Sequence, residues 1–133
     1  MNKNQSIMKS LLLFAFLLPA TLQTDANLSA ITQAISRGDA NALGAHFDES
    51  VEISILDKDE VYSKTNAIAA VKSFFGQYRP SAWSTVHKGA ARNNDSQYCI
   101  GNLTAGGKTF RVYIYVKDKG GRQLIQELRF DNE

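Results

Sequence analysis

The chain has 133 residues, which is enough for one domain of ordinary size and short for two. Hydrophobic residues make up 44% of the sequence and charged residues 21%, which excludes global disorder. Without Lys3, Lys9 and Asp25, the 15 basic and 13 acidic residues become 13 and 12. A chain with so balanced a charge lacks the basic surface expected of a nucleic-acid-binding protein. It also gives no electrostatic reason for binding to an anionic membrane.

Residues 1–26 have the layout of a secretory signal peptide. Two lysines precede a short apolar run at residues 11–18, and no acidic residue comes before the run or within it. A basic start, an apolar run of about 7–15 residues and small residues at a cleavage site are the parts of such a signal. The run is too short to be a membrane anchor, because crossing a bilayer takes about 20 apolar residues. We expect cleavage after Ala26, or alternatively after Ala20, and a periplasmic or secreted domain over residues 27–133.

Two helices are predicted at the start of this domain. Asn27 is suited to cap the first helix, and Gly38 fits the left-handed position just after its end. The apolar positions of the first helix follow the helical period: Leu28, Ile31, Ala34 and Ile35. Asp39 is suited to cap a second, shorter helix, which carries Leu43, His46 and Phe47.

A strand and a third helix come next. Alternate residues between positions 51 and 55 are apolar, the pattern of a half-buried strand, and a charged turn is expected over residues 57–60. Ser63 is suited to cap the third helix and Gly76 to end it. The apolar positions of this helix again have helical spacing: Ala67, Ile68, Val71, Phe74 and Phe75.

The chain after Pro80 is predicted to form four strands, at residues 83–88, 97–103, 109–116 and 124–130. Gly106-Gly107 predicts a two-residue hairpin turn that pairs Ala105 with Lys108. This register makes one face apolar: Cys99, Gly101, Leu103, Phe110, Val112 and Ile114. Cys99 is the only cysteine, so no intramolecular disulfide can form, and its place on the apolar face predicts a buried thiol.

The last turn, at residues 119–121, decides which side of the final strand faces the core. A two-residue turn would bury Glu127 and Arg129, at a cost of several kcal/mol per ion. A three-residue loop keeps both charges outside together with Ile125, and we expect this arrangement. The inner side of the strand would then consist of Leu124, Gln126, Leu128 and Phe130.

Five sets of residues follow one another in a distinctive order: Ile55-Leu56-Asp57-Lys58 with Val61-Tyr62-Ser63, Phe74-Phe75, Tyr98-Cys99-Ile100-Gly101, Phe110-Arg111-Val112-Tyr113, and Leu124-Ile125-Gln126-Glu127-Leu128-Arg129. With them the chain resembles, over residues 27–132, an uncharacterised family of small exported bacterial proteins with the nuclear transport factor 2-like (cystatin-like) fold. The resemblance implies an α+β fold, in which two or three N-terminal helices pack on a curved antiparallel sheet to form a cone. It implies no activity, because this fold hosts isomerases, dehydratases, transport factors and plain binding modules.

Enzymes of this fold hold an acid or a base inside the cone, so we looked for such a group. His87 shares one side of its predicted strand with Trp83 and Thr85. If this side is concave, the three residues line the mouth of the cone. If it is convex, Ser84 and Val86 point inward instead.

Gln126 and Tyr62 complete the pocket candidates. Gln126 is the one polar residue predicted on the inner side of the last strand, where it contacts either a ligand or a neighbour such as Tyr62. His46 is expected to be an ordinary helical histidine. The two histidines have no metal-ligand spacing, and there is no Gly-x-Ser-x-Gly elbow, so no catalytic residue, metal or other cofactor is predicted.

The outer face of the sheet is predicted to be rich in aromatic side chains beside arginine, the composition of interface hot spots. The candidate interface residues are Tyr98, Ile100, Arg111, Tyr113 and Tyr115, with Ile125 and Arg129 beside them. Ordinary cross-strand pairing is the alternative explanation. We favour a homodimer formed through this face.

The sequence therefore predicts an exported domain that binds a small apolar ligand or a protein partner and carries out no catalysis. The alternative is an isomerase, dehydratase or hydrolase-type enzyme that uses the cone as its pocket and His87 as its base. A deep cavity with His87 facing into it would favour the enzyme. A cone filled by Phe74, Phe75 and Leu128 would exclude it.

Overall fold

The computed structural model describes residues 23–133. It contains three helices, α1 (Gln23–Arg37), α2 (Ala40–Gly44) and α3 (Lys64–Gln77). It also contains six strands, β1 (Phe47–Ile55), β2 (Lys58–Ser63), β3 (Pro80–Ala90), β4 (Ser96–Ala105), β5 (Lys108–Lys119) and β6 (Arg122–Asn132). Within these residues, no helix has the length and apolar character needed to cross a membrane. Residues 1–22 of the predicted signal peptide, with the alternative cleavage site after Ala20, lie outside the described residues, whereas the expected site after Ala26 lies within α1.

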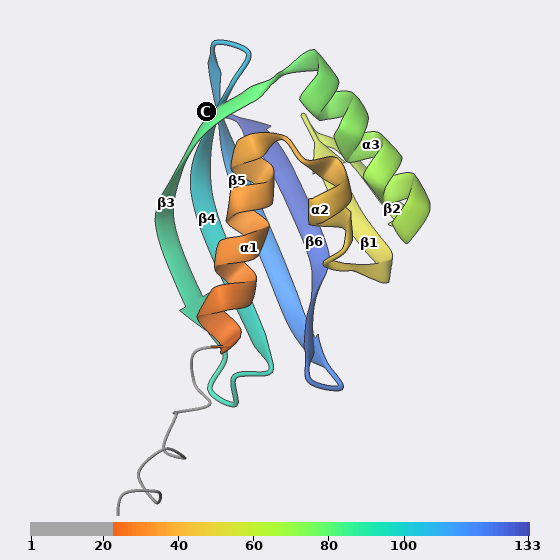
Figure 1. The fold of residues 1–133 in the computed structure, drawn as a ribbon, viewed down its shortest axis with the longest axis vertical. Helices are drawn as coiled ribbons and strands as arrows, with labels where there is room; N and C mark the ends of the chain where they lie inside the picture. The colour runs from red at the N-terminus through yellow and green to blue at the C-terminus, as the bar shows by residue number, and fades with distance from the viewer. Residues whose placement is uncertain (1–22) are drawn as a thin grey trace, which may run out of the picture.

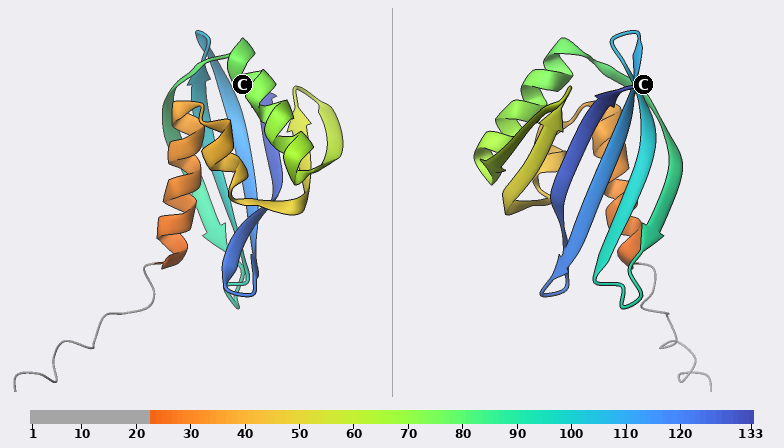
Figure 2. Two further views of the ribbon diagram at one scale, coloured as in Figure 1. Left: turned by 45° about the vertical axis from the view of Figure 1, so that its right-hand side comes forward. Right: turned by 180° about the vertical axis from the view of Figure 1, so that it is seen from behind.

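The six strands form one curved sheet in the order β2-β1-β6-β5-β4-β3, and the helices lie on one side of it (Figures 1 and 2). The helices α1 and α2 stand in front of the sheet, and α3 lies in front of β1 and β2 (Figure 1). The predicted α+β class, with helices packed on a curved sheet, is confirmed. One pairing differs from an all-antiparallel sheet, because β1 runs parallel to β6.

Two of the predicted helix caps are confirmed. The side chain of Asp39 accepts a hydrogen bond from the amide of Ala42 at the start of α2, and the Ser63 hydroxyl accepts one from the amide of Asn66 at the start of α3. Both bonds satisfy amide groups that have no partner within the first turn of a helix.

Gly38 follows the end of α1 with a φ of 67°, as predicted, but three other predicted helix limits are wrong by a few residues. Asn27 lies inside α1, which begins four residues before it. His46 and Phe47 are not on α2, because the chain leaves that helix at Ala45 and Phe47 begins β1. Gly76 does not end α3, which continues to Gln77.

The hairpin between β1 and β2 turns earlier than predicted. Its two turn residues are Leu56 and Asp57, with φ angles of 51° and 70°, and Ile55 pairs with Lys58. Positive φ at both central residues is the conformation of a type I′ turn, which asparagine, aspartate and glycine tolerate best. Leu56 carries no such signal, so the sequence pointed to the charged residues that follow.

The hairpin between β4 and β5 has the predicted register. Ala105 pairs with Lys108, and both turn glycines have positive φ. The predicted apolar face, with Cys99 on it, is buried against the helices. The thiol of Cys99 is therefore inside the core, as expected.

The final hairpin differs from the prediction. Its turn has two residues, Gly120 and Gly121, and Lys119 pairs with Arg122. Further along, Val116 pairs with Ile125 and Tyr115 with Glu127, so Gln126 is an extra residue that forms a β-bulge. Ile125 lies in the core and was wrongly expected outside, whereas Leu124 and Gln126 were wrongly expected inside. Leu128 and Phe130 are buried and Glu127 and Arg129 face outward, as predicted.

Aromatic side chains fill the space between α3 and the sheet. The ring of Phe74 lies 4.6 Å from that of Phe130 and 5.3 Å from that of Phe110, and Phe75 lies edge-on to Phe130 at 6.0 Å. All four rings are buried, and Leu128 beside them is fully buried. The part of the cone under α3 is thus packed core.

Candidate functional site

A row of aromatic side chains crosses the outer face of the sheet, on the side away from the helices. The ring centroids of His87 on β3 and Tyr98 on β4 are 5.4 Å apart, and those of Tyr98 and Tyr113 on β5 are 6.4 Å apart. Ile100 pairs with Tyr113, and Tyr115 pairs with Tyr98. We call His87, Tyr98, Ile100, Tyr113 and Tyr115 the aromatic strip.

A β-bulge in β3 brings His87 to this face. Thr85 pairs with Gly101 on the buried face of β4, whereas His87 pairs with Ile100 on the outer face. Val86, between them, is the extra residue that interrupts the alternation. The prediction that His87 shares a side with Trp83 and Thr85 is therefore wrong, because a bulge breaks the two-residue period on which it rested.

Gly89 lets the strip lie close to the sheet. The ring of Tyr98 covers this glycine, and a Cβ atom built there would stand 2.6 Å from the ring carbon Cε1. Covering a strand glycine with a cross-strand aromatic ring is a known way to stabilise such a strand. Because Gly89 has no side chain, the Tyr98 ring can lie over it and beside the ring of His87.

Charged residues border the strip on β6 and β1. Glu127 lies directly beside Glu52 in the parallel β1–β6 pair. Partial burial, and then the nearby Glu52, raise the pKa of Glu127, while Arg129 opposes the shift. The guanidinium of Arg129 is 3.8 Å from carboxylate oxygens of both Glu127 and Asp131. The sequence reasoning missed the pair of glutamates, because no local pattern predicts that β1 runs beside β6.

Four of the predicted interface residues are half-buried: Tyr98, Ile100, Tyr113 and Tyr115. Arg111 lies on the same outer face. The Nε of Arg111 donates to Oδ1 of Asn102 at 2.9 Å, and a terminal nitrogen lies 3.3 Å from Oε1 of Glu133. Arg111 is therefore held by its own chain. Burial, and then the charge of Glu127, raise the pKa of Tyr113.

Trp83 and Thr85 are on the inner side of β3, where Trp83 is half-buried and Thr85 is exposed. The indole Nε1 of Trp83 donates to Oγ1 of Thr85 at 2.9 Å, and the ring covers Gly101 in place of a side chain. Burial raises the pKa of the Cys99 thiol, and a hydrogen bond with Thr85 opposes that shift. Trp83 packs against the core, so this side of the strand serves packing.

Tyr62 lies apart from the other pocket candidates. It lines a hollow of about 250 Å³ between the β1–β2 hairpin and α3. The other lining residues are Ile53, Ile55, Lys58, Ala70 and Ser73. A hydrogen bond with Glu60 is the main cause that raises the pKa of the Tyr62 hydroxyl.

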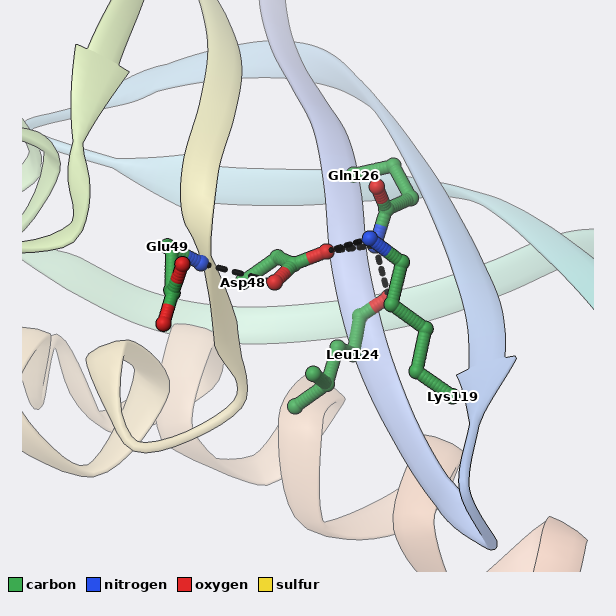
Figure 3. A network of polar contacts seen from close by, with 5 residues as sticks. All are labelled: Asp48, Glu49, Lys119, Leu124 and Gln126. Carbon is green, nitrogen blue, oxygen red and sulfur yellow. Dashed lines mark hydrogen bonds and ion pairs between the residues drawn. The ribbon is translucent and has the colours of Figure 1, made fainter.

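Gln126 belongs to a polar network at the bulge (Figure 3). Its Nε2 donates to Oδ2 of Asp48 at 3.0 Å and to the carbonyl of Leu124 at 3.2 Å. The Nζ of Lys119 lies 2.6 Å from the same Asp48 oxygen, and the amide of Glu49 donates to Oδ1. These bonds, led by the one from Lys119, lower the pKa of Asp48 to about 2. The half-buried amide of Gln126 thus has structural partners, and Tyr62 is not among them.

His46 also has a structural place. Its carbonyl accepts a hydrogen bond from the amide of Ile125 at 2.7 Å, which joins the start of β1 to β6. Burial, and then the charge of Arg122, lower the pKa of the His46 imidazole. Over the described residues, no group of three or more His, Cys, Asp or Glu side chains is placed to hold a metal ion.

Comparison with known proteins places the chain in a family. Residues 28–131 match the model described as "Domain of unknown function (DUF4783)". Crystal structures of DUF4783 proteins from Bacteroides uniformis and Bacteroides ovatus are similar to this chain, with TM-scores of 0.75 and 0.74 and identities of 21% and 25%. The first comparison covers 79% of this chain and 95% of the other, and the second covers 87% and 96%.

An NTF2-like protein from Cytophaga hutchinsonii has the same fold, with a TM-score of 0.61 and 20% identity over 84% of this chain and 98% of the other. No curated protein matches the sequence. The family match spans most of the chain, and its structural relatives include NTF2-like proteins, as the sequence resemblance implied. The chain therefore belongs to the DUF4783 family, a family of unknown function with the NTF2-like fold.

Proposed function

We propose that this protein is an exported interaction domain without catalytic activity, and that it self-associates through the outer face of its sheet. The aromatic strip carries the proposal. It sets tyrosine, histidine and isoleucine side chains side by side on an otherwise polar surface. Aromatic residues of this kind supply much of the binding energy of protein interfaces.

The charged border makes the face complementary to itself. In a dimer with its two-fold axis along β5, the strands β3 and β4 of one copy face β6 and β1 of the other. Tyr98 would then lie opposite Glu127, because both belong to one row of paired residues that continues to Glu52. A carboxylate there can accept a hydrogen bond from the tyrosine hydroxyl. The same residue types would meet twice, as a two-fold interface requires.

The enzymatic alternative requires His87 to act as a base inside the cone. His87 lies on the outer face, so it does not enter the cone, and Gln126 is occupied by Asp48. Phe74, Phe75 and Leu128 fill the region under α3, which supports the proposal of a domain without catalytic activity. The hollow beside Tyr62 is the candidate site for a small apolar ligand.

Sedimentation equilibrium of the purified protein tests self-association. Tyr113→Glu, in the middle of the strip, is expected to raise the dimer dissociation constant about tenfold or more, the loss typical of a central interface residue. His87→Glu, at an exposed position, is expected to act in the same direction without disturbing the core. The matched control is Ala69→Glu, which adds a carboxylate on the exposed side of α3.

A wild-type protein that stays monomeric at tens of micromolar would contradict the dimer. So would dimers that both strip variants leave unchanged while their circular dichroism spectra remain native.

Export is tested separately by cell fractionation and intact-mass measurement of the processed chain. A mass that lacks residues 1–26 or 1–20 in an extracytoplasmic fraction supports the signal peptide. Cleavage after Ala26 would remove the first turn of α1, which begins at Gln23, whereas cleavage after Ala20 would leave the helix complete.

A further inference from the structure

On the other side of the molecule, a groove runs along the junction of α1, α2 and α3. It consists of two neighbouring hollows of about 540 and 440 Å³, which share Arg37, Gly38 and Lys72. One hollow extends toward Asn41 on α2. The other extends past the end of α3 to Arg79. We call this the basic groove.

Three of the residues that line the basic groove are cationic: Arg37, Lys72 and Arg79. Among the residues that the structure describes, none of the three forms an ion pair, although cations elsewhere, such as Arg129, do. The one acidic lining residue, Asp39, has its Oδ1 engaged by the amide of Ala42. Cations gathered in a groove of a nearly neutral domain attract a negatively charged partner.

The floor of the groove is apolar and rigid. Phe75, Ala40 and Pro80 are buried there. Gly38 has a positive φ and lies against the Pro80 ring, where an added Cβ would stand 3.0 Å from Cδ. The turn between α1 and α2 is therefore fixed by packing, so the groove is formed before any partner binds.

Gly76 supplies a second, independent observation. It lies in the last turn of α3, its φ is not in the left-handed region, and apart from its chain neighbours and the nearby helix backbone no atom lies within 4 Å of a Cβ added there. Neither backbone conformation nor crowding calls for glycine, which costs a helix about 1 kcal/mol relative to alanine. A glycine at such a site allows another chain to approach the helix backbone closely.

We propose that the basic groove binds an extended acidic segment of a partner protein. The groove is open, and its three cations come from three places in the chain: the end of α1, the middle of α3 and the loop before β3. A row of Asp and Glu side chains meets such spaced cations one by one, and guanidinium groups bind carboxylates through paired hydrogen bonds. The apolar floor accommodates the small apolar residues between the acidic ones.

Fluorescence anisotropy with labelled peptides tests this. A peptide of about eight residues that alternates Glu or Asp with Ala is expected to bind at low salt, and the matched Gln/Asn peptide is not. Lys72→Glu combined with Arg79→Glu is expected to lower the affinity about tenfold or more, because each change replaces an attraction by a repulsion. The control is Lys64→Glu with Arg92→Glu, which changes the net charge equally at exposed sites outside the groove.

Gly76→Ala provides a charge-neutral check. It is expected to weaken peptide binding at least twofold while slightly raising the melting temperature of the protein. Equal losses in the two double variants would overturn the proposal, because they would show attraction to net charge alone. Binding of inorganic phosphate or succinate at Lys72 and Arg79, with no binding of the acidic peptide, would overturn it in favour of a small anion.

Discussion

Gln126 is the bulged residue of β6, and it donates a hydrogen bond across the sheet to Asp48 of β1 at 3.0 Å. Asp48 also lies 2.6 Å from Lys119, which precedes the two-glycine turn. One carboxylate therefore holds together the bulge, the turn and the point where β1 begins to run beside β6. The bulge lets the chain keep a tight turn while placing Ile125 and Leu128 in the same core.

Asp48→Asn is expected to destabilise the fold by about 1–2 kcal/mol near neutral pH. The pKa of Asp48, lowered from 3.8 to about 2, implies up to about 2.5 kcal/mol, and the exposure of Lys119 reduces this. A folded-state pKa below the unfolded one stabilises the protein above the unfolded pKa. This contribution should therefore be complete above about pH 4 and fade as the pH falls toward 2. Urea unfolding of both proteins at several pH values measures it.

The difference between wild type and Asp48→Asn isolates Asp48 from other groups that titrate in the same range, such as Glu127. Asp118→Asn, at an exposed position near the same turn, is the control and is expected to change stability little. A difference that stays constant from pH 6 to pH 2.5 would contradict the role assigned to the ion pair.

The sequence predicted the middle of the sheet better than its ends. The glycines at 106 and 107 and the strict alternation around them determined the β4–β5 register, because one residue of slip would have exposed the apolar face. At the last turn the sequence presented a conflict: a two-residue turn would bury Glu127 and Arg129. A three-residue loop would keep both charges outside, and this was the prediction. The protein instead keeps the two-residue turn and moves the charges outside by a bulge at Gln126.

A bulge leaves no reliable local signal, which also explains the error at β3. The predicted alternation of side chains between the two faces of β3 is correct for Trp83 and Thr85. After the bulge at Val86 it is reversed, so that His87 lies on the outer face. The position of His87, on which the catalytic hypothesis depended, could therefore not be read from spacing alone. The basic groove was missed for another reason: Arg37 is far in the sequence from Lys72 and Arg79, and it lines the same groove only through helix packing.

Gly101→Ala is expected to displace the ring of Trp83, because the new Cβ would overlap it. The loss of packing and of the Trp83–Thr85 hydrogen bond should cost about 1–3 kcal/mol. Trp83 is the only tryptophan, so its fluorescence reports directly on this site, and its emission should shift to longer wavelength. Gly107→Ala, at a turn with open space, is the control for fluorescence. An unchanged emission spectrum in Gly101→Ala would contradict the placement of the ring.

Cys99 is expected to react slowly with thiol reagents in the folded protein. It is buried, and burial raises its pKa, so little of the reactive thiolate is both present and accessible. The reaction should accelerate in urea in parallel with unfolding, as measured by absorbance after addition of an aromatic disulfide. Rapid reaction in the native protein, at the rate seen in urea, would show that the thiol is exposed.

Gly89→Ala is expected to change the aromatic strip much more than the hydrophobic core. The added Cβ would stand 2.6 Å from the Tyr98 ring carbon Cε1, and the three atoms nearest to it all belong to Tyr98, whose ring must move. We therefore expect a change in stability below about 1 kcal/mol, since the main change is to one cross-strand contact of the half-buried Tyr98 ring. The dimer dissociation constant should nevertheless rise, because His87, Tyr98 and Tyr113 would no longer form one continuous surface. Sedimentation equilibrium measures the dimer and thermal unfolding measures the fold. Unchanged association in a variant whose Tyr98 ring has moved would mean that the partner binds elsewhere on the sheet.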